Sequence, residues 1–311
     1  MKFAIVGTGG VGGYFGGRLA QSGEDVWFIA RGDHLTSMQK HGLTVNASDE
    51  TFVIPPGKMT DDYGTIGKVH VVLFCVKSYD TESAAATLAP ILTGESIVIS
   101  LQNGVDNEEK IRGVIPRGTV YGGAAYIYAS VSEPGVITQP SGPRRIVFGA
   151  MRPENQHGKP ILDAFLGAGI KAELTDDIQA ALWIKFIFIS AVGGVTAMTR
   201  LTLGEILAVS ETRQMLEDAM RETKSVAQAL NVRVPANIIE RMFENVKSMA
   251  TNTYSSTYHD LVNQKPLEIE AFSGTLLRYG QQLHLAMPTH RAIYASLLPY
   301  HLKHLRNRRP T

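Results

Sequence analysis

The sequence predicts a two-domain α/β protein, in which a doubly wound and mostly parallel sheet is followed by an all-α domain. Three observations support this. Apolar runs alternate with helical patterns up to about residue 115, turn clusters then separate strand-like stretches up to about residue 148, and no convincing strand follows Asp176. Because 311 residues is long for one hydrophobic core, we expect a first domain at 1–174 and a second at 175–311.

The first domain contains short apolar runs, which are typical of strands buried on both faces of a sheet. Strands are predicted at 3–6, 25–31, 43–45, 52–54, 70–76 and 96–101, and helices at 14–20, 34–41, 79–92 and 106–115. The turn clusters Ser132–Gly135 and Pro140–Pro143 separate strands at 120–129, 135–139 and 145–148, which indicates antiparallel strands appended to the sheet. A helix at 156–167 and a strand at 171–174 complete the domain.

The second domain has helical spacing throughout, with helices predicted at 178–198, 211–230, 236–246, 266–283 and 289–305. Its longest apolar stretch, Leu182–Met198, is interrupted by Lys185 and a Gly-Gly pair. We interpret this stretch as too short and too polar for a membrane span. The basic run His301–Arg309 is expected to be solvated.

The composition excludes several classes of partner. An apolar content of 44% is ordinary for a soluble protein, and a net charge of +1 gives no long-range attraction to nucleic acid or to an anionic membrane. The single cysteine, Cys75, rules out an intrachain disulfide, and no metal site is expected. The chain begins directly with the first strand, so we expect no signal or transit peptide and a cytoplasmic location.

The turn between the first strand and the first helix has the spacing G-x-G-x-x-G, formed by Gly7, Gly9 and Gly12. In such a unit the first glycine allows the tight turn, the second lets the backbone approach a pyrophosphate, and the third lets the helix pack closely on the sheet. The helix N-terminus then presents N–H groups to the phosphates. We therefore predict a dinucleotide-binding loop; the alternative is a glycine-rich turn in some other α/β protein. The loop comprises Gly7, Thr8, Gly9, Gly10, Val11 and Gly12.

The end of the second strand indicates which dinucleotide binds. An NAD site usually has Asp or Glu there to hold the ribose hydroxyls, whereas a 2′-phosphate needs a cation. Here the strand ends in Arg31, while Asp25 lies at its other end and Asp33 lies beyond the turn. A guanidinium suits phosphate, so we predict NADPH as the cofactor. The alternative is that Arg31 is a solvated loop residue.

Two polar residues directly follow predicted strands, where ligands bind in open α/β sheets: Lys77 and Asn103. We expect both to lie over the nicotinamide half of the cofactor site. Each could equally be a loop residue that caps a neighbouring helix, and Asn103-Gly104 could be a simple turn.

Lys185 interrupts a helix that is apolar on nearly every side. A buried ammonium is costly unless it has a partner, a lowered pKa or an open cleft, so one interpretation is a general acid that protonates a ketone oxygen. The other is a lysine whose amine extends to the surface from a buried helix. Glu268, between Leu267 and Ile269, could hold Lys185 or a substrate hydroxyl, or could be an exposed helix carboxylate.

These residues together resemble the ketopantoate reductase (2-dehydropantoate 2-reductase) family along nearly the whole chain. The motifs that carry the resemblance are Gly7–Gly12, Arg31, Val76-Lys77-Ser78, Gln102-Asn103-Gly104-Val105, Trp183-Ile-Lys185-Phe, Ser255-Ser256-Thr-Tyr-His-Asp260 and Leu267-Glu268-Ile-Glu270. The resemblance implies a Rossmann domain followed by a helical domain like that of 6-phosphogluconate dehydrogenase.

The resemblance also implies roles for individual residues. Gly7, Gly9, Gly12 and Arg31 would bind NADPH, and Lys77 and Asn103 would line the cofactor and substrate site. In the second domain, Lys185 would be the catalytic acid, Ser256 would hydrogen-bond the substrate, and Glu268 would bind it and orient Lys185. The implied reaction is the NADPH-dependent reduction of 2-dehydropantoate to pantoate, in pantothenate biosynthesis.

The chain departs from the family pattern at three positions. The family usually has asparagines one and two turns after the catalytic lysine, where this chain has Ile189 and Gly193, and Thr253 replaces a third polar residue. Ile189 and Gly193 favour a rival hypothesis, a reductase of the same architecture that acts on a more apolar 2-oxo acid. A non-catalytic NADP(H)-binding sensor is a further alternative, and a homodimer is expected because such helical domains often associate.

Overall fold

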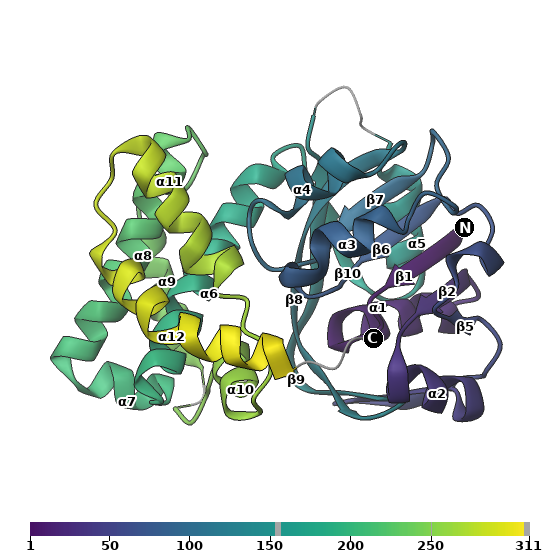
Figure 1. Cartoon of the computed structure of the whole chain (residues 1–311), viewed down its shortest axis with the longest axis horizontal. Coiled ribbons are helices and arrows are strands. Elements are labelled where there is room, and N and C mark those ends of the chain that lie inside the picture. Colours follow the sequence, from purple (N-terminus) through teal and green to yellow (C-terminus); the bar gives the residue numbers. More distant parts are fainter. Residues whose placement is uncertain (153–156, 250, 308–311) are drawn as a thin grey trace. The chain divides into compact units, whose positions relative to one another are not determined.

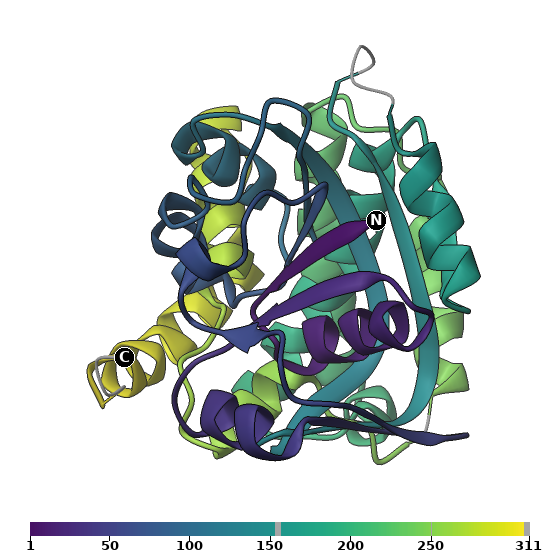
Figure 2. The same ribbon diagram turned by 90° about the vertical axis from the view of Figure 1, so that its right-hand side faces the viewer.

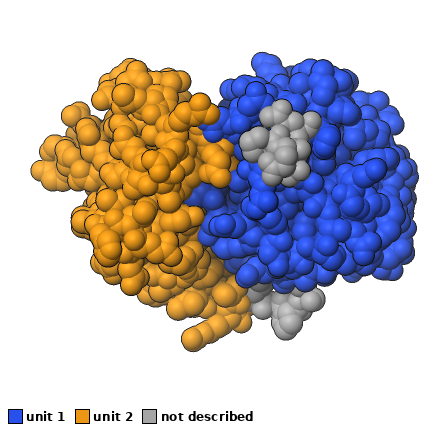
Figure 3. All heavy atoms as spheres, turned by 90° about the horizontal axis from the view of Figure 1, so that it is seen from above, with its two compact units in different colours: residues 1–178, 311 blue, residues 179–310 orange. Residues whose placement is uncertain are grey.

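The computed structural model describes residues 1–152, 157–249 and 251–307. They form two compact units, which divide after Ile178, and each unit is described by itself below (Figure 3). The sequence places the domain boundary at Leu174, at the end of the last strand.

The first unit contains the strands. Its elements are β1 (Lys2–Val6), α1 (Gly10–Gln21), β2 (Asp25–Ile29), α2 (Gly32–His41), β3 (Leu43–Ala47), β4 (Thr51–Ile54), β5 (Met59–Thr60), β6 (Val71–Phe74), α3 (Thr81–Ala86), β7 (Ile97–Ser100), α4 (Asn107–Val114), β8 (Thr119–Glu133), β9 (Val136–Ala150), α5 (Lys159–Gly167) and β10 (Lys171–Leu174) (Figure 1).

These strands form one ten-stranded sheet in the order β4-β3-β9-β8-β7-β6-β1-β2-β5, with β10 paired to β9. The six strands β5-β2-β1-β6-β7-β8 are all parallel and follow the 3-2-1-4-5-6 order of dinucleotide-binding folds. Beyond them, β9 runs antiparallel to β8, and β4 runs antiparallel to β3. The predicted Rossmann-type sheet with appended antiparallel strands is therefore confirmed.

Alternate residues of the parallel strands enter two separate cores, one on each face of the sheet. Phe3 and Ile5 of β1 pack with residues of α1, α2 and α5, whereas Ala4 and Val6 pack with residues of α3 and α4. Figure 2 shows α1 against the sheet. Burial on both faces explains why these strands are almost uninterrupted apolar runs.

Two predictions in the first unit are wrong. Pro140–Pro143 does not separate two strands but lies within the single strand β9. Arg144 pairs with Ile127 and Ser141 pairs with Tyr128, so the intervening Gly142 and Pro143 form a bulge. In place of the single helix predicted at 79–92, the chain forms a 3₁₀ turn at Ser78–Asp80 and then the short helix α3. After Ala86 the chain continues in turns.

The second unit consists of helices joined by loops, with no strand among its described residues. Its elements are α6 (Ile178–Thr199), α7 (Leu203–Ala208), α8 (Ser210–Ala229), α9 (Ile238–Ser248), α10 (Ser256–Val262), a π-helical turn (Glu270–Gly274), α11 (Thr275–Leu283) and α12 (Pro288–Asn307). Sequence patterns did not predict α7 or α10, which have six and seven residues. The helix predicted at 266–283 is also wrong at its start, because regular helix begins only at Thr275.

The longest apolar helix, α6, is a core helix of the second unit. Its 22 residues and mean hydropathy of 1.8 meet the length and composition of a membrane span, so the expectation that this stretch is too short and too polar is wrong. However, 67% of its most apolar window is buried inside the protein. Burial against the other helices, rather than length, identifies α6 as a core helix.

Candidate functional site

Three neighbouring strands of the first unit end side by side, and each is followed by a loop with predicted site residues. Val6 of β1 pairs with Phe74 of β6, which pairs with Ser100 of β7. The glycine loop, the loop of Lys77 and the loop of Asn103 therefore start at one edge of the sheet. Strand order reverses at β1, which is where ligands bind in open α/β sheets.

The glycines of the first loop are required for different reasons. Gly7 has a φ of +93°, and a Cβ there would lie 2.7 Å from the backbone nitrogen of Val76. A Cβ on Gly12 would lie 2.9 Å from the side chain of Ile5. Gly9 differs, because its φ is −83° and an added Cβ would meet nothing within 4 Å. The fold does not demand glycine at position 9, so the open space beside it fits the close approach of a pyrophosphate.

The N-terminus of α1 has the properties of an anion site. Gly9 is its N-cap residue, no side chain caps it, and its first turn contains no acidic residue. The N–H groups of this turn and the positive end of the helix dipole favour phosphate. The loop and the helix together thus fit a dinucleotide.

Thr8 is held inside the fold. Its hydroxyl and its backbone N–H both donate to the carbonyl of Ile29, each at 3.0 Å. Its own carbonyl lies 2.8 Å from Nε2 of His34, while the N–H of Gly135 donates to Nδ1 of His34 at 2.9 Å. Since Nδ1 accepts, Nε2 carries the proton and donates to Thr8; burial lowers the pKa of His34 and favours this neutral form. We therefore expect Thr8 to hold the loop, and the loop backbone around it to contact the cofactor.

Arg31 lies exposed at the end of β2, as the N-cap residue of α2. Its guanidinium forms no ion pair with a described residue. Asp33 lies in the first turn of α2, so a carboxylate is also near this end of the strand. The position suits contact with the adenosine ribose or its phosphate, and the preference for NADPH stays a prediction.

A chain of buried side chains joins the loops that follow β6 and β7. Nε2 of Gln102 donates to the carbonyl of Val76 at 3.0 Å and to the hydroxyl of Thr81 at 2.8 Å. The Thr81 hydroxyl lies 3.3 Å from Oδ1 of Asn107, whose Nδ2 donates to the carbonyl of Asn103 at 3.0 Å. Each of the three linking side chains is at most 5% exposed. Because they are buried and hydrogen-bonded, they fix one loop relative to the other.

The predicted site residues of these loops are half-buried. Lys77 is the N-cap residue of the 3₁₀ turn at Ser78–Asp80, and Asn103 precedes Gly104, whose φ is +124°. Both therefore lie beside the network that joins their loops, at the carboxyl ends of adjacent strands.

A buried carboxyl lies next to this network. Glu108, in the first turn of α4, is 1% exposed, and its Oε2 has no hydrogen-bond partner among the described residues. Burial raises its pKa to about 7, although a hydrogen bond from Ser100 acts in the opposite direction.

In the second unit, the helix of the predicted acid Lys185 packs against the segment that follows Glu268. The rings of Phe186 and Phe272 have centroids 6.0 Å apart, as do those of Trp183 and Tyr279. Lys185 is half-buried, and Glu268 is 7% exposed. The alternative of an exposed helix carboxylate for Glu268 is therefore wrong.

The helix that begins with Ser256 also contacts α6. Ser255 is its N-cap residue: its Oγ accepts the N–H of Tyr258 at 3.1 Å and the hydroxyl of Thr196, on α6, at 2.6 Å. Ser256 itself is exposed. Ser255 thus fixes α10 to α6, and the neighbouring Ser256 remains accessible to a ligand.

The positions that depart from the family pattern lie along α6 and before α10. Ile189 is half-buried, one turn after the predicted acid. A Cβ on Gly193 would lie 2.9 Å from the hydroxyl of Thr257 and 3.5 Å from the ring of Phe272. The carbonyl of Thr253 accepts the N–H of Leu203 at 2.9 Å. Position 193 is therefore closely packed and has no room for a larger side chain without movement.

Comparison with known families decides the identity of this fold. A model described as "Ketopantoate reductase PanE/ApbA" matches residues 3–153, and its companion "Ketopantoate reductase PanE/ApbA C terminal" matches residues 177–301. The chain belongs to the ketopantoate reductase family. It is therefore an oxidoreductase of a pyridine-nucleotide-dependent family.

Individual relatives of this ketopantoate reductase family member match it over nearly its whole length. The uncharacterized oxidoreductase YkpB of Bacillus subtilis (strain 168) is 29% identical over 301 residues, which are 96% of this chain and 99% of that protein. A 2-dehydropantoate 2-reductase of Nostoc sp. is 28% identical, with 95% and 94% covered. The crystal structure of a PanE/ApbA family ketopantoate reductase from Ralstonia eutropha JMP134 superposes with a TM-score of 0.90 at 30% identity, covering 98% of this chain and 100% of that one.

The same fold also occurs in an enzyme with a different substrate. A ternary structure of D-mandelate dehydrogenase with NADH and anilino(oxo)acetate has a TM-score of 0.89 at 21% identity, covering 98% of this chain and 99% of that one. At this identity the likeness concerns the fold alone.

Within each unit, the structure brings most of the predicted site residues of this family member onto contacting elements. Sequence patterns did not identify the residues that hold them: Thr81, Asn107 and His34 in the first unit and the buried histidines of α12 in the second. Gln102 is part of the motif Gln102-Asn103-Gly104-Val105, but its role in the network was not predicted. Its position could have indicated that role, because an amide side chain directly after a buried strand needs a hydrogen-bond partner. Among the described residues, no group of three His, Cys, Asp or Glu side chains could hold a metal ion.

Proposed function

We propose that this chain catalyses the NADPH-dependent reduction of a 2-oxo acid to the 2-hydroxy acid, with 2-dehydropantoate as the first candidate substrate. The observation that carries the proposal lies in the second unit. A helix whose single charged side chain is Lys185 packs against both the segment of Glu268 and the helix of Ser256. An amine, a carboxylate and a hydroxyl on contacting elements are the groups that such a reduction needs.

The first unit would bind the cofactor. The loop Gly7–Gly12 and the N-terminus of α1 would hold the pyrophosphate, and Arg31 would contact the 2′-phosphate. When bound, NADPH supplies the hydride that adds to the ketone carbon. Lys77 and Asn103, at the carboxyl ends of β6 and β7, would orient the reacting groups.

The second unit would bind the substrate and supply the proton. Ser256 would hydrogen-bond the substrate, and Glu268 would bind it and orient Lys185. The ammonium of Lys185 would give a proton to the ketone oxygen as the carbon receives hydride, so that a hydroxyl forms rather than an alkoxide. The ammonium is then restored by a proton from water.

A substitution tests the acid. Lys185→Ala should lower kcat by about 10²- to 10⁴-fold, because general acid catalysis contributes about that factor. The assay is NADPH oxidation with a panel of 2-oxo acids, and NADPH affinity should be unchanged in this variant. Lys303→Ala, which removes an exposed lysine of α12, is the matched control. An unchanged kcat in Lys185→Ala removes this residue from the role of acid.

A second candidate function is the reduction of a more apolar 2-oxo acid. It is favoured by the apolar Ile189 and by Gly193, where an added Cβ would already lie 2.9 Å from the hydroxyl of Thr257. A kcat/KM that is higher for 2-oxo acids with branched or aromatic side chains than for 2-dehydropantoate would support it. NADPH binding without turnover of any 2-oxo acid would instead indicate a non-catalytic sensor. A homodimer and a cytoplasmic location stay predictions.

A further inference from the structure

The helix α12 contacts the backbone on the N-terminal side of Glu268 through two histidines. Nδ1 of His304 donates to the carbonyl of Lys265 at 3.0 Å, and the N–H of Leu267 donates to Nδ1 of His301 at 3.1 Å. Both histidines are buried, at 5% and 4% exposed. The expectation that the basic run from His301 is solvated is therefore wrong for these two residues, and the part beyond residue 307 lies outside the described residues.

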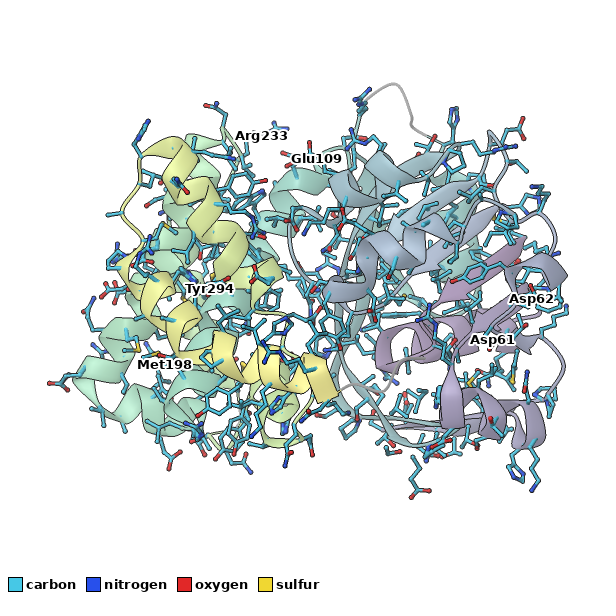
Figure 4. The ribbon with its side chains drawn as sticks, viewed as in Figure 1. Asp61, Asp62, Glu109, Met198, Arg233 and Tyr294 are labelled. Atoms are coloured by element: carbon cyan, nitrogen blue, oxygen red, sulfur yellow. The ribbon has the colours of Figure 1, made fainter. Side chains whose placement is uncertain are left out.

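The same helix contacts the segment on the C-terminal side of Glu268. The hydroxyl of Tyr294, labelled in Figure 4, donates to the carboxylate of Glu270 at 2.6 Å. Farther along, Nδ1 of His290 lies 3.1 Å from the hydroxyl of Ser273. Glu268 is thus flanked on both sides by backbone or side chains that α12 holds.

These four contacts come from one face of α12. At about 100° per residue, positions 290, 294, 301 and 304 fall within about 80° of one another. The segment that they hold contains the π-helical turn Glu270–Gly274, in which the N–H of Gly274 reaches the carbonyl of Ile269 at 2.9 Å. Single π-helical turns occur frequently at functional sites, and this one departs from the regular helix that the sequence predicts.

Of these four side chains, His301 contacts the residue nearest to Glu268 in the sequence, Leu267. Because Leu267 N–H donates to Nδ1, this nitrogen is unprotonated and the ring carries its proton on Nε2. Burial lowers the pKa of His301 and favours the neutral ring, while the nearby Glu270 acts in the opposite direction. The ring therefore accepts the backbone N–H of Leu267, the residue directly before Glu268.

We propose that His301 is a positioning residue for Glu268, which fixes the backbone at Leu267 so that the carboxylate is held where it binds the 2-oxo acid. The inference rests on the proposed role of Glu268 as a substrate ligand. Such a residue acts on substrate binding through its neighbour, and removing it should affect the 2-oxo acid and not the nucleotide.

Two substitutions test the acceptor role. His301→Leu keeps an apolar side chain of similar size and removes the acceptor, whereas His301→Asn can present its Oδ1 near the position of Nδ1. We expect His301→Leu to raise the KM for the 2-oxo acid about tenfold with a smaller change in kcat, because one buried hydrogen bond is lost. In His301→Asn the KM should return to within about threefold of the parent value, and NADPH affinity should be unchanged in both.

A matched control separates positioning from loss of stability. Val246→Ala removes buried volume from the same core on α9, a helix that packs against α8. It should lower the melting temperature without raising the KM. The proposal is overturned if His301→Leu leaves the KM unchanged, if Val246→Ala raises it equally, or if His301→Asn gives no recovery.

Hydrogen exchange gives a readout that does not depend on turnover. Amides 267–270 should exchange faster in His301→Leu than in the parent protein, while amides of α9 should not. Parent-like exchange at Leu267 overturns the inference even if the reductase assay succeeds. Conversely, absence of turnover in the parent protein contradicts the proposed function, and the exchange result still decides whether His301 holds this segment.

Discussion

Substituting Gly9 by alanine should separate cofactor binding from folding. The backbone at position 9 has φ −83° and ψ −160°, which alanine adopts without strain, and an added Cβ would meet nothing within 4 Å. As an N-cap residue, alanine stabilises the folded state less than glycine does, by about 0.5–1 kcal/mol. Alanine also lowers the conformational entropy of the unfolded chain, which stabilises the folded state by a similar amount, about 0.4–1 kcal/mol. The free energy of unfolding should therefore change by less than about 0.5 kcal/mol.

The affinity for NADPH should fall much more. The methyl group would occupy the space through which a phosphate oxygen approaches the loop backbone. A hydrogen bond to a charged group contributes about 1.5–3 kcal/mol, so losing one raises the Kd about 10- to 100-fold. Gly10→Ala, in contrast, should prevent normal folding, because its Cβ would overlap the carbonyl of Ala129.

The assay is a fluorescence titration with NADPH, combined with a thermal melt followed by circular dichroism. Gly113→Ala is the matched control, since Gly113 lies within α4 and a Cβ there also meets nothing within 4 Å. It should leave the Kd unchanged. If Gly9→Ala is folded and binds NADPH like the parent protein, the open space beside Gly9 is not a phosphate site.

Three further substitutions probe the first unit. Arg31→Ala should raise the KM for NADPH about tenfold or more and that for NADH little, and an equal effect on both refutes the 2′-phosphate contact. Gln102→Leu should destabilise the protein by about 1–3 kcal/mol and raise the KM for the 2-oxo acid, because the carbonyl of Val76 loses its hydrogen-bond donor. An unchanged KM and kcat would show that the link between the two loops is dispensable. Burial raises the pKa of Glu108 from 4.5 to about 7, so between these two pH values the folded state retains a proton that the unfolded chain releases. The free energy of unfolding should therefore fall by up to about 3 kcal/mol as the pH rises from 4.5 through 7. Glu108→Gln should abolish this fall in denaturant titrations at pH 5 and pH 8, and an unchanged slope with pH contradicts the assignment.

Much of the first unit could be predicted from the sequence, because its central strands are buried on both faces. Burial of that kind leaves runs such as Val71–Phe74 without polar residues. A run of four or five apolar residues between two helices is therefore readily identified as a strand. The glycine loop was equally predictable, since Gly7 needs a positive φ and Gly12 must pack on the sheet. The bulge at Gly142 was not, because Pro-Ser-Gly-Pro favours a turn and only the pairing with β8 keeps the chain extended.

The environment of Glu268 could not be predicted, for a different physical reason. Its segment is held by contacts with residues 34 and 39 positions away in the chain, and such contacts leave no periodic pattern. The local sequence favours continuous helix from Pro266, and the tertiary contacts of α12 override that preference. The same contacts bury His301 and His304, which the sequence places in a solvated run, and make them hydrogen-bonding groups of the core.

The packing at Gly193 links the choice of substrate to the geometry of the second unit. A Cβ at this position would come within 2.9 Å of the hydroxyl of Thr257, the neighbour of Ser256, and would touch Phe272, which follows Glu268 by one turn. Acquiring an amide there would therefore require the side chain of Thr257 to shift, on the helix that carries the proposed substrate ligand Ser256. A hydroxylated 2-oxo acid must then find its hydrogen-bond partner at Ser256 or Glu268, whereas an apolar one needs none. For this reason the size of residue 193 and the polarity of the preferred substrate should change together.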